Sequence, residues 1–99
     1  MEENKQKGLE IELSQEVAQG HYSNLAIIAH SPSEFIVDFA AILPGLQKAH
    51  VKTRVILTPE HAKRLLLSLQ ENIARYENNI SRIDLEKRPA AGFKPLGEA

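Results

Sequence analysis

The chain has 99 residues, of which 42% are hydrophobic and 25% are charged, and its formal net charge at pH 7 is -1. This length and composition are typical of one globular domain rather than of a disordered chain or two ordinary domains. The near-neutral charge argues against general electrostatic capture of nucleic acid or an anionic membrane. The absence of cysteine excludes disulfides and a cysteine nucleophile.

Four segments are predicted as β-strands, the second by its richness in leucine and isoleucine and the other three by their alternation of apolar and polar side chains. They are residues 9–13, 24–30, 34–42 and 49–57. A turn at Pro32 and a break at Pro44-Gly45 separate the last three, because proline and glycine interrupt regular structure. We therefore expect a largely antiparallel meander.

The turns also predict how the strands pair. A hairpin centred on the first turn places Ile27 opposite Val37, and one centred on the second places Asp38 opposite Lys52. Both registers put the odd-numbered apolar residues on one face of the sheet. We expect a helix to cover that face.

One long helix is predicted from Pro59 to about Glu86. Thr58 suits the N-cap and Pro59 the first helical position. Such a helix would extend about 40 Å, whereas an eight-residue strand reaches about 26 Å. The alternative is a helix that ends near Asn78-Asn79.

The apolar residues of this helix recur at alternating gaps of four and three, which is the heptad seam of paired helices. The half of the helix that overhangs the sheet would leave part of this seam uncovered, and a second copy of the chain is the simplest cover. We therefore predict a homodimer. Its interface residues are Leu69, Ile73, Tyr76, Ile80 and Ile83.

No pattern predicts catalysis, a cofactor or a metal site. The four histidines, at positions 21, 30, 50 and 61, lack the compact spacing of metal ligands. There is no nucleophile elbow or P-loop. Glu34 and Asp38 share a strand face, but an open face does not provide the secluded pocket that acid–base chemistry needs. We expect a protein that is not an enzyme.

Basic residues recur along the last predicted strand, at Lys48, His50, Lys52 and Arg54. On one face they could pair across strands with Asp38. The alternative is a nucleic-acid-binding module that uses these four residues together with Lys63 and Arg64 at the start of the helix.

Several blocks of the sequence resemble domain-of-unknown-function family 3467, a family of small prokaryotic proteins. They are residues 20–24 (GHYSN), 30–35 (HSPSEF), 38–39 (DF), 43–45 (LPG), 53–66 (TRVILTPEHAKRLL), 72–73 (NI) and 76–77 (YE). The likeness covers about residues 9–80. It implies no reaction or ligand. It does imply a transcription-linked partner such as RNA polymerase, because some members are encoded beside polymerase subunit genes.

The polar residues of these blocks, with the two basic strand residues, are the candidates for partner binding. They are Tyr22, Asn24, Glu34, Asp38, Lys52, Arg54, His61, Lys63 and Arg64.

The sequence therefore predicts an α+β fold, an antiparallel meander of about four strands followed by one long C-terminal helix. Residues 9–88 form the single domain, between a flexible arm (1–8) and a flexible tail (89–99). The polar N-terminus and the absence of a long apolar run predict a cytoplasmic protein without membrane contact. We expect an interaction protein that docks on a larger assembly. A small-molecule binder with a pocket between helix and sheet is a further alternative.

Overall fold

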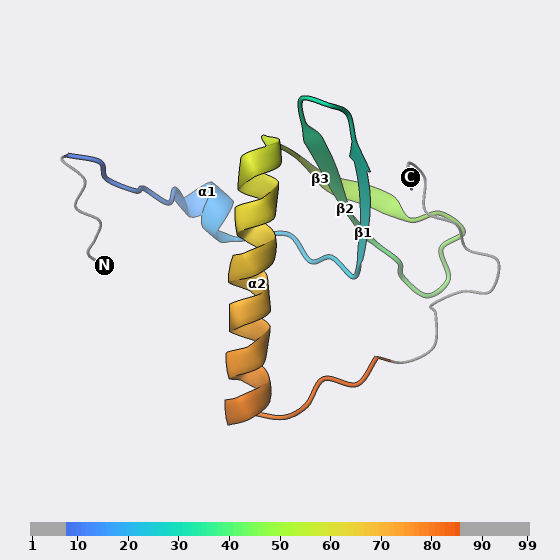
Figure 1. Cartoon of the computed structure of the whole chain (residues 1–99). Helices are drawn as coiled ribbons and strands as arrows, with labels where there is room; N and C mark the ends of the chain where they lie inside the picture. The colour runs from blue at the N-terminus through green and yellow to red at the C-terminus, as the bar shows by residue number, and fades with distance from the viewer. Residues whose placement is uncertain (1–7, 86–99) are drawn as a thin grey trace.

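The computed structural model describes residues 8–85. In chain order its elements are α1 (Gln15–Ala18), β1 (Leu25–His30), β2 (Phe35–Ala41), β3 (His50–Leu57) and α2 (Pro59–Asn79) (Figure 1). The three strands form one antiparallel sheet in the order β1-β2-β3. The α+β class and the meander followed by a C-terminal helix are thus confirmed. The predicted tail lies outside the described residues, as does the predicted arm except for Gly8.

Turn chemistry places the strand ends within one residue of the predicted bounds. After β1, the Ser31 N–H donates to the Glu34 carbonyl at 2.9 Å and closes a four-residue loop around Pro32. After β2, the Leu46 N–H donates to the Leu43 carbonyl at 3.2 Å. Gly45 has φ +85° in this second turn, a conformation that glycine adopts without strain.

The predicted first strand, residues 9–13, is wrong. This segment forms no strand, and Leu9, Ile11 and Leu13 are 60, 82 and 69% exposed. It extends with α1 away from the sheet (Figure 1). An alternating pattern specifies a strand only where a sheet edge is available for pairing, and within one copy of the chain this segment reaches none. The described sheet therefore has three strands.

The predicted registers are also wrong, by small shifts. Ile28, not Ile27, lies opposite Val37, because the loop contains four residues and the hairpin centre falls after Pro32. The even-numbered residues of β1 therefore share a face with the odd-numbered residues of β2.

Between β2 and β3, Asp38 lies opposite Arg54 rather than Lys52. Phe39 is opposite Thr53 and the next residue, Ala40, is opposite Val51. Lys52 is thus the extra residue of a β-bulge. No turn signal in the sequence indicates it.

Local capping sets the start of α2. The Thr58 Oγ1 accepts a hydrogen bond from the His61 N–H at 3.1 Å, and Pro59 takes the first helical position. The helix ends at Asn79, as in the alternative considered above, and Ile80 is its C-cap. The predicted continuation to about Glu86 is therefore wrong. At 21 residues the helix spans about 31 Å, which still exceeds the length of the strands.

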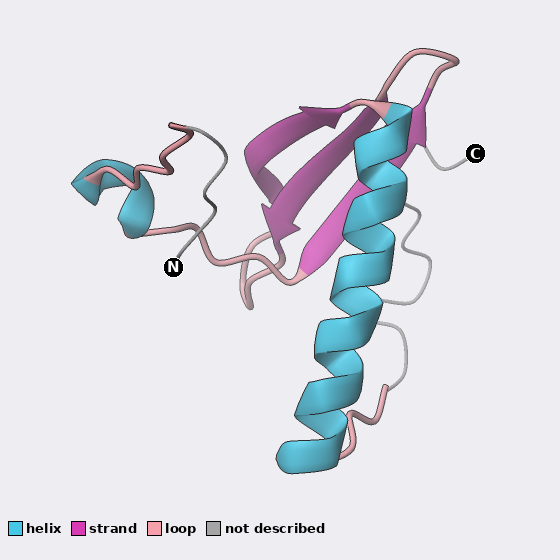
Figure 2. Cartoon of the chain, turned by 60° about the vertical axis from the view of Figure 1, so that its left-hand side comes forward, coloured by secondary structure: helices cyan, strands magenta, loops and turns pink. Residues whose placement is uncertain are grey.

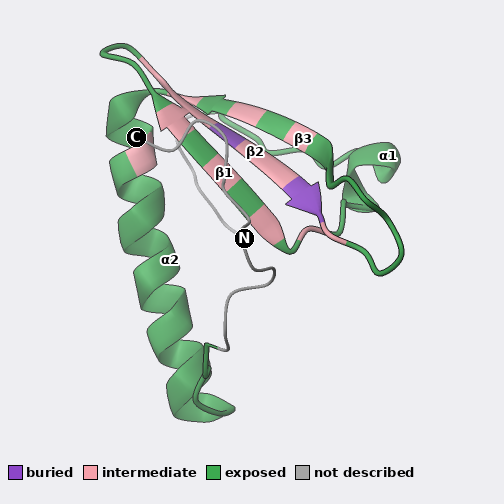
Figure 3. Cartoon of the chain, turned by 90° about the vertical axis from the view of Figure 1, so that its right-hand side faces the viewer, coloured by how far each residue is buried: buried purple, intermediate pink, exposed green. Residues whose placement is uncertain are grey.

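Little of this fold is buried. Among the described residues only Val37, Ala40 and Ala41 are buried, and all three lie on β2 (Figure 3). In α2 every residue except Ala62 is exposed. The helix meets the sheet at its first turns, and its lower half runs away from it (Figure 2). One copy of the chain therefore leaves most of its apolar side chains in contact with water.

Candidate protein interaction surface

An apolar groove lies where the first turns of α2 meet the sheet. Its volume is about 420 Å³, and its lining includes Ile28, Val37 and Leu57 from the sheet and Leu66 and Leu69 from the helix. Ile28 and Val37 are opposite one another, and Val55 follows on the same face. The helix was expected to cover the face of the odd-numbered apolar residues. The groove lies on this face in β2 and β3, whereas β1 contributes the even-numbered Ile28 to it.

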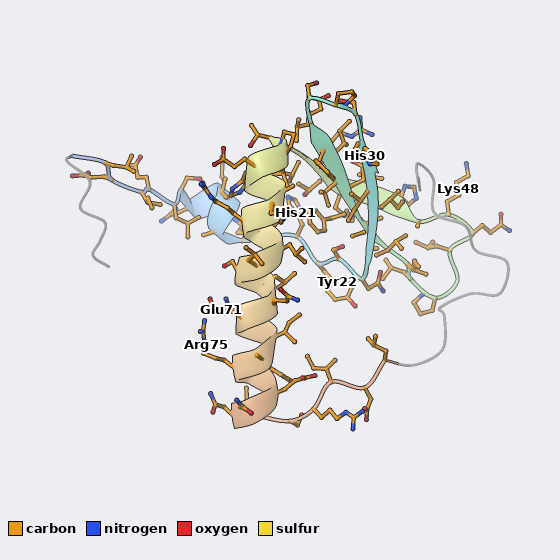
Figure 4. The ribbon with its side chains drawn as sticks, in the orientation of Figure 1. His21, Tyr22, His30, Lys48, Glu71 and Arg75 are labelled. Atoms are coloured by element: carbon orange, nitrogen blue, oxygen red, sulfur yellow. The ribbon has the colours of Figure 1, made fainter. Side chains whose placement is uncertain are left out.

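An exposed apolar stripe continues this groove along α2. Leu69, Ile73 and Tyr76 are 54, 40 and 43% exposed, and Ile80 at the C-cap is 67% exposed. Figure 4 shows Glu71 and Arg75 together on the side of α2 turned away from the sheet. The helix is thus amphipathic, and the structure leaves its apolar side open.

Four of the five predicted seam residues thus lie on the helix or its cap. Ile83 does not, because the helix has already ended. Its backbone N–H donates to the Glu77 Oε2 at 3.0 Å, which turns the chain back beside the last helical turn. The seam on α2 is therefore shorter than the apolar spacing predicted.

A cross-strand ion pair on the sheet joins Asp38 and Arg54. The Arg54 Nε and Nη2 donate to the two carboxylate oxygens of Asp38 at 2.7 and 2.8 Å. These hydrogen bonds, with the positive charge of the guanidinium, hold the pKa of Asp38 below its ordinary value and raise the pKa of Arg54. The side chain of Asp38 is only 14% exposed, whereas that of Arg54 is 60% exposed. The carboxylate is thus engaged in a cross-strand pair.

Asn24 has a structural role next to β1. Its Oδ1 accepts from the Ile42 N–H at 2.7 Å, and its Nδ2 donates to the Ile42 carbonyl at 3.0 Å. The amide thereby extends the β1–β2 ladder beyond the last backbone pair. Tyr22, two residues earlier, is 68% exposed and remains available to a partner (Figure 4).

The basic strand residues do not form one stripe. Arg54 is opposite Asp38 and His50 is opposite Ala41. Asp38 and Ala41 are three residues apart on a regular strand, so their partners lie on opposite faces of the sheet. Lys48 lies in the loop before β3 (Figure 4). The bulge therefore divides the predicted basic face.

The polar residues at the start of α2 are mostly engaged in helix formation. Arg64 pairs with Glu60 at 2.6 Å, one turn earlier. The His61 backbone is held by the cap. Lys63 contributes to the lining of the groove. Glu34 belongs to the β1–β2 loop, where its carbonyl closes the turn.

The part of the chain that the structure describes contains neither a metal site nor a membrane-spanning helix. Residues 8–85 contain no cluster of three or more histidine or acidic side chains placed to hold a metal. The imidazole of His30 stacks on Phe35, its cross-strand neighbour, at a centroid distance of 5.4 Å. No helix within this range combines the length and the apolarity needed to cross a membrane.

The sequence did not reveal that Ile28 belongs to the groove, because the predicted register turned it to the other face. The continuous apolar run of β1 was the available signal, since it offers an apolar side chain in either register.

The family model described as a protein of unknown function (DUF3467) matches residues 1–85. The chain belongs to this family. The resemblance that these sequence blocks carry is thereby confirmed. No curated protein and no solved structure matches the chain.

Proposed function

We propose that this DUF3467 protein is a non-catalytic interaction protein that acts in the cytoplasm as a homodimer and docks on a larger protein assembly. The observation that carries the proposal is the apolar groove and stripe of α2, exposed along the helix in a chain with three buried residues among those described. Monomeric proteins rarely expose apolar surface of this extent unless it binds something.

The chemistry of the groove favours a protein partner over a metabolite. Small-molecule sites combine an apolar lining with several convergent polar groups that fix the ligand. Here Lys63 is the charged residue of the lining, and the remaining residues are apolar. An apolar side chain from another polypeptide would fill such a groove without needing polar contacts.

The stripe can supply about the energy that a weak dimer needs. The exposed fractions of Leu69, Ile73, Tyr76 and Ile80 together equal about two whole side chains. Burying an apolar side chain contributes about 1.5–3 kcal/mol, so a symmetric pair gains about 6–12 kcal/mol. Association costs about 4–15 kcal/mol. The stripe alone therefore lies near break-even, and a stable dimer would use further contacts.

The sheet face that carries Asp38 and Arg54 remains for a larger partner, together with Tyr22 at its end. The family resemblance makes RNA polymerase the first partner to examine. The division of the basic residues between two faces weakens the case for nucleic acid, which would favour a continuous basic groove lined by stacking aromatics.

Sedimentation equilibrium over a concentration series tests the homodimer. We expect the wild-type chain to dimerise and Ile73→Glu to be monomeric, because a carboxylate cannot be buried in an apolar seam without a partner. Gln70→Glu is the matched control, since Gln70 lies with Arg64 and Glu71 on another side of the helix. An Ile73→Glu variant that dimerises as tightly as Gln70→Glu would refute the role of the stripe.

Affinity capture from native lysate at low and high salt tests the docking. We expect a defined protein complex that survives moderate salt, with polymerase subunits if the partner is transcription-linked. Recovery of nucleic acid that salt releases would instead support the nucleic-acid-binding alternative, because phosphate contacts weaken steeply with ionic strength.

A further inference from the structure

The two edge strands of the sheet differ in how well they are protected against pairing with a further strand. With strand order β1-β2-β3, both β1 and β3 are edge strands. The β3 edge carries Lys52, Arg54 and a bulge, which are devices that prevent a further strand from pairing. The β1 edge, Leu-Ala-Ile-Ile-Ala-His, has no acidic side chain, lysine, arginine, proline or bulge. It is therefore open to pairing.

The hydrogen bond that closes the hairpin shows which groups of β1 face outward. Ser31 and Glu34 form a hydrogen-bonded position of the ladder. Hydrogen-bonded and non-hydrogen-bonded positions alternate along an antiparallel pair, so Leu25, Ile27 and Ala29 bond to β2. The backbone groups of the remaining three, Ala26, Ile28 and His30, then point away from the sheet. No hydrogen bond among the described residues satisfies them.

The position of α2 fits an extension of the sheet on this side. Figure 3 shows α2 on the β1 side of the sheet, although the first turn of the helix follows directly from the end of β3 and lies close to it. Its apolar stripe therefore overhangs the place where a strand added to β1 would lie. An added strand would also bring apolar surface beneath that stripe.

We propose that β1 pairs antiparallel with β1 of a second copy across a two-fold axis, which joins the two sheets into one of six strands. This deepens the proposed homodimer, on which it rests, by assigning its central contact. A strand with apolar side chains on both faces is complementary to itself, as a two-fold interface requires. The axis also places both α2 helices on the same face, where each stripe meets the groove side of the partner.

The backbone pattern restricts the register. The outward groups of Ala26 and Ile28 must bond to outward groups of the other copy, so only residues of the same parity can face one another. Among these registers, the two that pair most of the six-residue strand place the two-fold axis between the two Ile27 residues or between the two Ile28 residues. The same residue of each copy then lies opposite itself.

Proline substitutions test the proposed pairing of β1, because proline removes a backbone N–H. Ala26→Pro removes an outward N–H, which an edge strand tolerates. We expect this variant to keep its circular dichroism spectrum while its dimer dissociation constant rises at least tenfold. Ala26→Val is the matched control and should dimerise normally. Ala29→Pro removes an N–H that bonds to β2, and we expect it to disrupt the sheet.

Cysteine cross-linking gives a second measurement that does not depend on proline. Because the chain has no cysteine, Ile27→Cys and Ile28→Cys each carry a single thiol. Opposed residues of an antiparallel pair lie about 4.5–5.5 Å apart between Cα atoms, a distance that a disulfide bridges. We expect one of the two variants to form a disulfide dimer on oxidation, and His50→Cys, on the β3 edge, to form none.

The outcomes separate the two proposals. A wild-type dimer that Ala26→Pro leaves intact, without a cross-link at position 27 or 28, overturns the β1 pairing but leaves a homodimer through α2. A wild-type chain that stays monomeric throughout the concentration series overturns both.

Discussion

Replacing Val37 with alanine tests whether the centre of β2 is the core of the protomer. Val37 is 8% exposed, and it lies between Ile28 on β1 and Val55 on β3. The substitution removes two buried methyl groups, each contributing about 0.8 kcal/mol. Val37 also lines the groove, so water can reach the space that is left and a large cavity penalty is not expected. We therefore expect a loss of about 2 kcal/mol in the free energy of unfolding.

The assay is urea unfolding followed by circular dichroism at a fixed protein concentration. For a protein of this size, with a slope between about 1 and 3 kcal/mol per molar, a loss of about 2 kcal/mol moves the midpoint by about 1 M. Val51→Ala on β3 is the matched control. Val51 is 52% exposed, so the same change should cost about half as much. Equal losses for the two variants would refute the placement of the core on β2.

Two further predictions concern single contacts. Because Arg54 lowers the pKa of Asp38 in the folded chain, the pair stabilises the fold fully above the unfolded carboxyl value of about 3.9. This contribution is lost as the pH falls through the lower folded value. Asp38→Asn should remove that part of the acid dependence in urea titrations between pH 2 and pH 6, and an unchanged dependence would contradict the pairing. Thr58→Ala removes the acceptor of the His61 N–H and should cost about 1 kcal/mol in the same assay. An unaltered midpoint would show that the cap is dispensable.

The elements that the sequence predicted well are those with local causes. The proline and glycine of the two turns and the Thr58-Pro59 start of the helix act within a few residues. They therefore fix the end of β1, both ends of β2 and β3, and the start of α2. The end of α2 was harder to predict. The apolar spacing continues to Ile83, but two consecutive asparagines, which have low helix propensity, precede the break at Ile80.

The register of the strands was predicted poorly because it depends on how many residues each turn and bulge contains. The types of the side chains do not reveal these numbers. One more residue in the loop after β1 moved Ile28 into the groove. A one-residue shift of the second turn, together with the extra residue at Lys52, joined Asp38 to Arg54. The predicted and observed pairings are chemically alike. Ile28 takes the place expected for Ile27, and Arg54 takes the place expected for Lys52. Only the assembled sheet distinguishes them. The candidate site inherited this error on the basic strand, but not on α2, where its residues follow from helical period alone.

The exposed surfaces of the protomer divide by chemistry. The groove, the stripe of α2 and the edge of β1 adjoin one another and are apolar, and they are the surfaces that we propose a second copy covers. The opposite face of the sheet carries the Asp38–Arg54 pair at its centre, and Ile56, 58% exposed, follows on β3. Joining two copies through β1 would double this second face into one continuous surface on the side away from both helices. A larger partner would then meet a flat, two-fold symmetric surface. Such a partner would bind the dimer more tightly than the protomer, because two linked contacts raise the effective concentration at each.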